Sequence, residues 1–175
     1  MVLSIALPIA IQNGITNFVN LLDNLMVGRI GTEEMSGVSI SNQLVFVFNL
    51  CIFGTVSGAG IVGAQFFGEK GDEGVKTTTR FKIVAGFVIT VIASAIFLLF
   101  GEKLISLFLT GDSNGGDLDK TLFFAMKYLR IMILGLPGFM LTQAYSSTLR
   151  EGGEAVLPMK AGIAAIFTNL ILNWV

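Results

Sequence analysis

Residues 83–100 read IVAGFVITVIASAIFLLF and contain no charged side chain. About 20 apolar residues in a helix cross the hydrocarbon core of a bilayer, which is roughly 30 Å thick. Residues 131–149 are also uncharged, and so are the 34 consecutive residues 35–68. Because these runs are too long for the core helices of a soluble domain, the three stretches predict transmembrane helices.

The composition of the whole chain agrees with a membrane protein. Of its 175 residues, 53% are hydrophobic and 13% are charged, whereas charged residues make up about 25% of soluble domains. The net charge of −1 and the scattered basic residues indicate no nucleic-acid partner. Histidine is absent and Cys51 is the single cysteine, so the sequence offers no His-activated nucleophile and no disulfide framework. We therefore expect neither an enzyme nor a bound cofactor.

Two weaker stretches complete the set of helices. Residues 1–28 contain one charged residue, Asp23, and one proline, Pro8. Residues 155–175 contain one charged residue, Lys160. The sequence thus predicts an all-α polytopic membrane protein with about five transmembrane helices, at about 3–27, 34–66, 80–100, 120–148 and 157–175. We expect Pro8 and Pro137 to kink their helices.

The orientation follows from the distribution of lysine and arginine, which cytoplasmic loops retain. The second and fourth connections, 67–79 and 149–156, carry with their flanks six basic residues: Lys70, Lys76, Arg80, Lys82, Arg150 and Lys160. The third connection, 101–119, is more acidic. We expect a multi-pass protein of the plasma membrane with a cytoplasmic N-terminus.

The first predicted helix has a polar face. Its asparagines fall within an arc of about 60° at 100° per residue, and they are Asn13, Asn17, Asn20 and Asn24. Gln12, Thr16 and Asp23 flank this arc on one side. Polar groups in hydrocarbon cost several kcal/mol unless they find partners. The face is therefore predicted to line a cavity, or to form hydrogen bonds between helices.

Asp23 is the one acid predicted to lie well inside a span. An ionisable group in a membrane helix is a candidate functional residue. Burial disfavours its charged form, whereas amide neighbours or a bound cation favour it. Such a group can exchange a proton or a sodium ion, and the alternative is a buried acid paired with a structural partner.

Two further polar sets lie in the later helices. Asn169 and Asn173 are four residues apart and share a helix face. Amide and carboxylate oxygens suit hard cations, so packing of this pair beside Asp23 would make a small oxygen cage. Gln143 belongs to a polar run after Pro137, which is predicted either to line the cavity or to mark an interfacial helix end.

Residues 58–63, GAGIVG, match the G-x-G-x-x-G dinucleotide fingerprint. That fingerprint binds a cofactor only after a strand and at the start of a helix, whereas here it lies within a predicted membrane span. Small residues at such spacing allow helices to approach closely in lipid, and Gly54 with Gly58 adds a GxxxG pair. Helix packing is the interpretation that we adopt.

With these residues in view, the sequence resembles the multidrug and toxic compound extrusion (MATE) family of cation-coupled efflux transporters. Residues 7–31, LPIAIQNGITNFVNLLDNLMVGRIG, are similar to the first helix of that family. Residues 37–71 resemble its long second helix with a glycine-rich end containing A-Q-x-x-G. Residues 148–173 are similar to its R-x-x-G, P-M and N-x-x-L-[DN] pattern. In order and at family spacing, these matches cover nearly the whole chain.

The resemblance implies a fold and a set of site residues. The family has twelve helices in two six-helix lobes, so residues 1–175 would be five of the six helices of the N-terminal lobe, without helix 6 and the C-terminal lobe. The coupling-ion site implied by the family falls on Asp23, Asn169 and Asn173. The last of these departs from the pattern, because some members have aspartate there, which leaves the choice between sodium and proton open.

The function implied is a secondary active antiporter that exports drugs or other amphipathic compounds in exchange for protons or sodium ions. Its partners would be the lipid bilayer, an amphipathic or cationic small molecule and the C-terminal lobe. One alternative is a lipid-linked oligosaccharide flippase of the same superfamily, which should carry basic residues within its cavity-facing spans. Only Lys127 and Arg130 are expected in the spans here. The other alternative is a membrane-inserted fragment without transport activity.

Overall fold

The computed structural model describes residues 2–28, 31–69, 71–109 and 117–174, except for the side chains of residues 2–5, 8, 20, 27 and 172–174. Within these ranges all regular structure is helical. The five helices are α1 (Val2–Gly28), α2 (Thr32–Gly68), α3 (Asp72–Leu109), α4 (Leu118–Glu151) and α5 (Val156–Trp174). The predicted all-α fold is confirmed.

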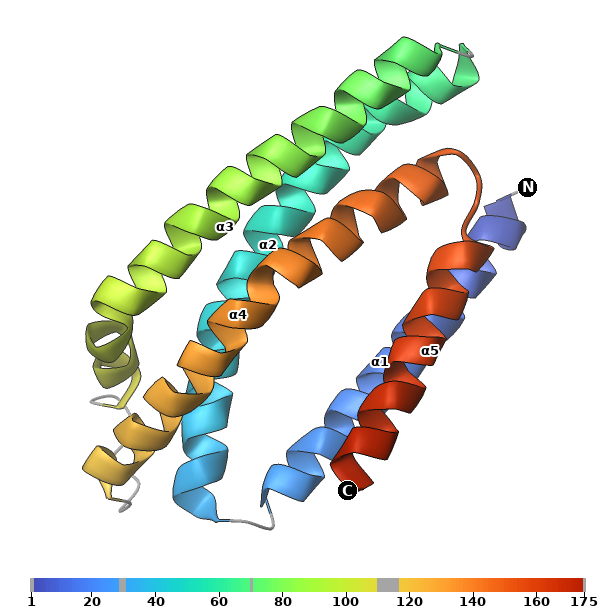
Figure 1. Ribbon diagram of the computed structural model, residues 1–175. Helices are drawn as coiled ribbons and strands as arrows, with labels where there is room; N and C mark the ends of the chain where they lie inside the picture. Colours follow the sequence, from blue (N-terminus) through green and yellow to red (C-terminus); the bar gives the residue numbers. More distant parts are fainter. Residues whose placement is uncertain (1, 29–30, 70, 110–116, 175) are drawn as a thin grey trace.

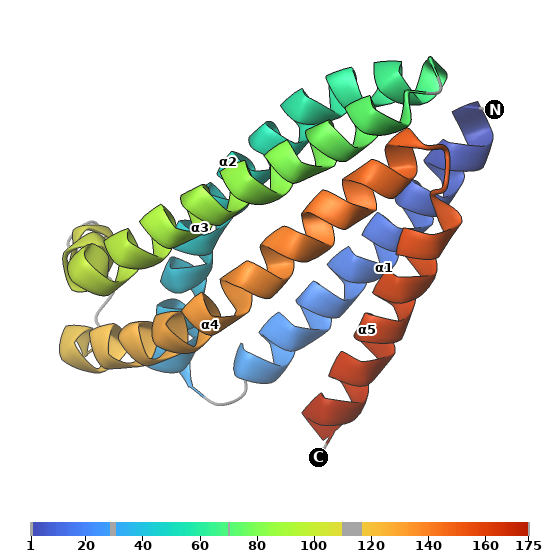
Figure 2. The same cartoon turned by 45° about the horizontal axis from the view of Figure 1, so that its top comes forward.

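The helices form two groups. α2, α3 and α4 pack into a three-helix bundle, while α1 and α5 lie side by side next to it and run in the same direction (Figures 1 and 2). Apolar side chains fill the centre of the bundle, among them Leu44, Phe48, Ile52, Phe97, Ile105, Leu129, Leu136 and Met140. The core thus belongs to α2, α3 and α4.

The outer surface of the bundle is also apolar. Leu134 is 83% exposed, Leu99 75% and Leu107 70%. Soluble proteins rarely expose large continuous apolar surfaces, but such a surface is compatible with lipid. By length and composition, α2, α3 and α4 are each able to cross a membrane, and α5 contributes a shorter apolar stretch, Val156–Ile171. This agrees with a polytopic membrane protein, whereas crossing by α1 and α5 stays a prediction.

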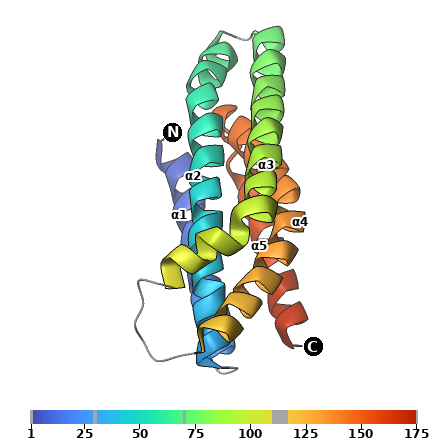
Figure 3. The same ribbon diagram turned by 90° about the vertical axis from the view of Figure 1, so that its left-hand side faces the viewer.

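α3 is longer than the sequence suggested. It runs over 38 residues, from Asp72 to Leu109, whereas the apolar run predicted a helix at about 80–100. At 1.5 Å per residue it measures about 57 Å, nearly twice the bilayer core. The prediction placed the helix ends at the first charges, but polar residues continue a helix beyond the hydrocarbon. Its last turns run across the bundle (Figure 3), where Ile105 and Leu109 join the core.

α2 and α4 approach most closely at Gly37. A Cβ atom built there would lie 2.9 Å from the backbone nitrogen of Ala125 and 3.0 Å from the carbonyl oxygen of Thr121. One turn later, the Ser41 hydroxyl, which is fully buried, donates to the carbonyl oxygens of Gly37 at 2.9 Å and Ala125 at 3.0 Å. Small residues therefore allow backbone contact between the two helices.

The turn between α4 and α5 has a defined geometry. Gly153 has φ of +87°, a conformation in which glycine avoids the strain of a side chain. Next to it, a Glu154 carboxylate oxygen accepts a hydrogen bond from the backbone nitrogen of Leu157 at 3.1 Å. The turn thus ends α4 and starts α5 within a few residues.

We predict that Gly37→Ala destabilises the bundle, because the new methyl group would meet backbone atoms that cannot rotate away. The expected loss is about 1–3 kcal/mol, as for overpacked cores, measured as the unfolding free energy in detergent. Gly54→Ala is the matched control, since no described atom lies within 4 Å of a Cβ at that position of the same helix. Equal stability of the two variants would contradict the close approach.

Candidate functional site

Asp23 lies on the side of α1 that faces the other helices. Its side chain is half-buried and interacts electrostatically with Tyr128 of α4. The Tyr128 hydroxyl donates a hydrogen bond to Oδ1 of Asn42 in α2 at 3.2 Å. The acid therefore lies near a polar pair that joins α2 and α4, neither member of which was predicted as a site residue.

The asparagine arc of α1 faces away from the bundle. Asn13, Asn17 and Asn24 are exposed, whereas Val19 on the other side of the helix is 6% exposed. The side chain of Asn20 lies outside the described residues. The prediction that this arc lines a cavity therefore remains a prediction.

Gln12 and Thr16, which flank the arc, have partners. Nη2 of Arg150 donates to Oε1 of Gln12 at 2.9 Å, and the hydroxyl of Thr16 donates to the backbone oxygen of Gln12 at 2.9 Å. A Cβ at Gly162 would lie 2.6 Å from Nε2 of Gln12. Gln12 thus connects α1 with both α4 and α5.

The predicted coupling residues of α5 lie on the neighbour of α1. Because α1 and α5 run in parallel from the Gln12–Gly162 contact, the stretch of α5 that holds Asn169 and Asn173 lies level with the later part of α1. Asn169 is exposed, and the side chain of Asn173 lies outside the described residues. The oxygen cage with Asp23 is consequently still a prediction.

A cation bound by Asp23, Asn169 and Asn173 would be coordinated mainly by neutral oxygens. Among the residues that the structure describes, no three His, Cys, Asp or Glu side chains gather in a metal-binding group. Hard cations accept amide and hydroxyl oxygens beside a single carboxylate. Asp23 is thus the one charged ligand among the predicted coupling residues.

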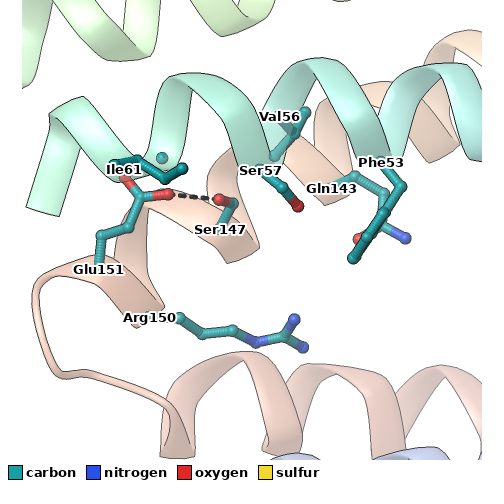
Figure 4. Close-up of a pocket in the computed structure, with 9 residues that line it drawn as sticks. Phe53, Val56, Ser57, Ile61, Gln143, Ser147, Arg150 and Glu151 are labelled. Carbon is teal, nitrogen blue, oxygen red and sulfur yellow. Dashed lines mark hydrogen bonds between the residues drawn. The ribbon is translucent and has the colours of Figure 1, made fainter.

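A pocket of about 410 Å³ lies between α2 and α4, and it includes Gln143, one of the predicted cavity residues. It is lined by Phe53, Val56, Ser57, Gly60, Ile61, Gln143, Ser147, Arg150 and Glu151 (Figure 4). Apolar side chains come mainly from α2, whereas α4 supplies the amide, hydroxyl and charged groups. Pro137 lies inside α4, and the side chain of Pro8 is outside the described part.

A buried ion pair lies at the edge of this pocket. Nζ of Lys82 donates to both carboxylate oxygens of Glu151 at 2.5 Å, and its side chain has no exposed surface, against 11% for Glu151. The Ser147 hydroxyl donates to Oε1 of Glu151 at 2.5 Å, and Lys82 also approaches Oγ1 of Thr148 at 3.4 Å. Such pairing is what allows a lysine to remain buried.

Glycines of α2 make room for this pair. Cβ atoms at Gly60 and Gly63 would lie 2.6 Å and 2.5 Å from the carboxylate oxygens of Glu151. The predicted helix packing is confirmed at Gly60 and Gly63 of the segment 58–63. The same packing was also expected at Gly54 and Gly58. At those two positions no described atom lies within 4 Å of a Cβ, so helix packing at Gly54 and Gly58 stays a prediction.

The sequence analysis missed the ion pair because it treated charges as helix boundaries. Lys82 fell inside the predicted helix at about 80–100 but was counted with the flank of the connection 67–79. Glu151 was assigned to the connection 149–156, whereas it is the last residue of α4. Lys82 directly precedes the uncharged run 83–100 of α3, so the expectation that Lys127 and Arg130 are the only basic residues in the spans stays a prediction. A usable signal was present, since Thr78, Lys82, Gly86 and Thr90 recur every four residues and are all buried.

We predict that Lys82→Met or Glu151→Gln alone strongly destabilises the protein, because each leaves the partner's charge buried without compensation. The expected loss is about 3 kcal/mol or more, measured by unfolding in detergent. The double variant should recover part of the loss, and Lys76→Met, which removes an exposed lysine from the same helix, should change little. A single variant as stable as the Lys76→Met control would contradict the role of the pair.

Comparison with known proteins finds relatives that are named as multidrug resistance proteins or as a transporter. The chain is similar to a probable multidrug resistance protein NorM of Thermotoga maritima, with 24% identity over 172 residues, 98% of this chain and 36% of the relative. It is also similar to a probable multidrug resistance protein YoeA of Bacillus subtilis, with 28% identity over 94% of this chain and 34% of the relative. An uncharacterized transporter, C4B3.13, of Schizosaccharomyces pombe is 30% identical over 85% of this chain and 27% of the relative.

The chain thus spans about a third of the length of the curated relatives it matches. No solved structure gives a significant match. The MatE family profile matches residues 8–175, nearly the whole sequence. Its apolar helices agree with a multi-pass membrane protein, and the chain belongs to the MatE family.

Proposed function

We propose that this chain forms the N-terminal lobe of a secondary active transporter that exports amphipathic compounds in exchange for protons or sodium ions. The names of the bacterial relatives, probable multidrug resistance proteins, support drug efflux as the activity. The observation that carries the coupling part of the proposal is the position of Asp23, a half-buried acid on the side of α1 that faces the other helices.

In this mechanism, Asp23 binds a proton or a sodium ion when the lobe opens to the side where that ion is concentrated. Neutralising the carboxylate removes the cost of holding a charge in low dielectric, which favours a different packing of α1 against α4 and α5. Alternating access then requires movement of one helix group relative to another. The separation of α1 and α5 from the three-helix bundle (Figure 1) supports such a movement.

We place the protein in the plasma membrane with its N-terminus in the cytoplasm. The end of the structure that holds the α2–α3 and α4–α5 turns carries Lys76, Arg80, Arg150 and Lys160. Cytoplasmic ends retain such residues. α4 starts at the opposite end of the structure. Asp117 caps the start of this helix by accepting a hydrogen bond from the backbone nitrogen of Lys120.

The flippase alternative receives limited support. Lys82 is a basic residue at the edge of the uncharged run of α3, but its charge is neutralised by Glu151 at 2.5 Å. A lysine so paired offers no free charge to the headgroup of a lipid-linked sugar. Drug efflux is therefore the function that we propose first.

We predict that Asp23→Asn abolishes gradient-driven export in a two-lobe transporter that contains this sequence, while protein level is maintained. The substitution keeps the shape of the side chain and removes the charge that would exchange with the ion. Export of a fluorescent cationic dye from everted vesicles under an imposed proton or sodium gradient measures the effect. Asp119→Asn, at an exposed position of α4, is the control and should retain export.

Wild-type export by Asp23→Asn would show that the coupling ion binds elsewhere. A loss of export by the control as well would point to a general defect instead of a role in coupling.

The orientation gives a further prediction. On a Cys51→Ser background, an impermeant maleimide added to intact cells should label Asp119→Cys, and should label Glu69→Cys only after the membrane is permeabilised. Both positions are exposed, so accessibility to the reagent depends on the side of the membrane. Labelling of Glu69→Cys alone in intact cells would reverse the orientation.

A further inference from the structure

The pocket between α2 and α4 carries an uncompensated positive charge. Glu151 is already neutralised by Lys82, with both carboxylate oxygens 2.5 Å from Nζ. Figure 4 shows Glu151 turned toward α2, while Arg150 points away from it, to the opposite side of the pocket. Within the described part of the chain, no acidic side chain forms an ion pair with Arg150. One net positive charge therefore remains at the pocket.

The guanidinium of Arg150 is also short of hydrogen-bond acceptors. Its Nη2 donates to the amide oxygen of Gln12 at 2.9 Å, but its Nε is buried without a partner among the described residues. A guanidinium has five N–H donors and no acceptor, and a buried donor without a partner is costly. An anionic group in the pocket would balance the charge and accept hydrogen bonds from the guanidinium.

The rest of the lining suits an amphiphile. Gln143 and Ser147 add polar groups on the α4 side, near Arg150, whereas Phe53, Val56 and Ile61 present an apolar wall on α2. A ligand with a compact anionic head and an apolar chain would place each part against matching groups. A small hydrophilic anion would leave the apolar wall unused.

The depth of the pocket fits a lipid headgroup. Arg150 is one residue before the end of α4, and α2 continues for eight residues beyond Gly60, about 12 Å at 1.5 Å per residue. Because α2, with 37 residues, is much longer than the bilayer core, we expect its end to project past the membrane surface. The Arg150 level then corresponds to the polar zone of the bilayer, where phosphates lie.

We propose that this pocket binds the phosphate headgroup of an anionic membrane lipid, with Arg150 as the main contact and the wall of α2 against the start of the acyl chain. This lipid is distinct from the exported compound. The proposal does not rest on the efflux function, because it needs neither ion coupling nor the second lobe.

The test uses the 175-residue chain reconstituted in phosphatidylcholine vesicles that contain trace spin-labelled phosphatidylglycerol or spin-labelled phosphatidylcholine. We expect the association constant of the chain to be about tenfold higher for phosphatidylglycerol than for phosphatidylcholine, because one charge-assisted contact supplies a factor of that size. Arg150→Gln should abolish this preference. Arg130→Gln, which removes an exposed arginine from the same helix, is the matched control and should retain it.

A second variant covers the case in which Arg150→Gln fails to fold, as judged by circular dichroism. Ser57→Phe fills the pocket from α2 without changing any charge, and it should also abolish the preference.

Added inorganic phosphate separates two sources of the anion: competition would show that the phosphate alone is recognised, whereas persistence of the lipid preference would show that the lipid chain contributes. Either result supports an anion site at Arg150.

The proposal is overturned if the wild-type chain immobilises both lipids equally, or if folded Arg150→Gln keeps the preference. It is also overturned if Arg130→Gln loses as much preference as Arg150→Gln, because the effect would then reflect the overall charge of the protein.

Discussion

The requirement that a fully buried lysine have a carboxylate partner governs the packing of the three-helix bundle. Lys82 comes from α3 and Glu151 from the end of α4, so the ion pair holds those two helices together. The carboxylate also lies against Gly60 and Gly63, which brings α2 to the same point. Because single loss of either charge would leave the other buried and unpaired, the three helices depend on one another at this end of the bundle.

At the other end of α2, the contact is made by backbone and not by charge. Gly37 and Ser41 bring α2 against Ala125 of α4, with a hydroxyl that donates to both helices. The bundle is therefore fixed at two places by different means. The hydrogen bond from Arg150 of α4 to Gln12 of α1 joins the second group, α1 and α5, to this bundle. In the proposed transport cycle, α1 and α5 would shift while the three-helix bundle keeps its packing.

The sequence predicted the number and order of the helices because lipid imposes long apolar runs, which are visible without knowledge of packing. It did not predict where the helices end, since polar residues such as Lys76 and Thr78 belong to α3 before its predicted start at about residue 80. Nor did it predict partners across helices: Asp23 was singled out, but its neighbour Tyr128 and the pair of Lys82 and Glu151 were not. Those contacts depend on helix rotation and crossing, which residue spacing along one helix does not specify.

The parallel arrangement of α1 and α5 has a consequence for biosynthesis. The two helices are neighbours in space, but 127 residues lie between the end of α1 at Gly28 and the start of α5 at Val156. At a ribosomal rate of about 5–20 residues per second, α1 waits roughly ten seconds before the helix that covers it is made. During that interval the translocation machinery or the lipid has to shelter Gln12 and Asp23. Synthesis speed thus becomes one of the conditions under which this lobe assembles.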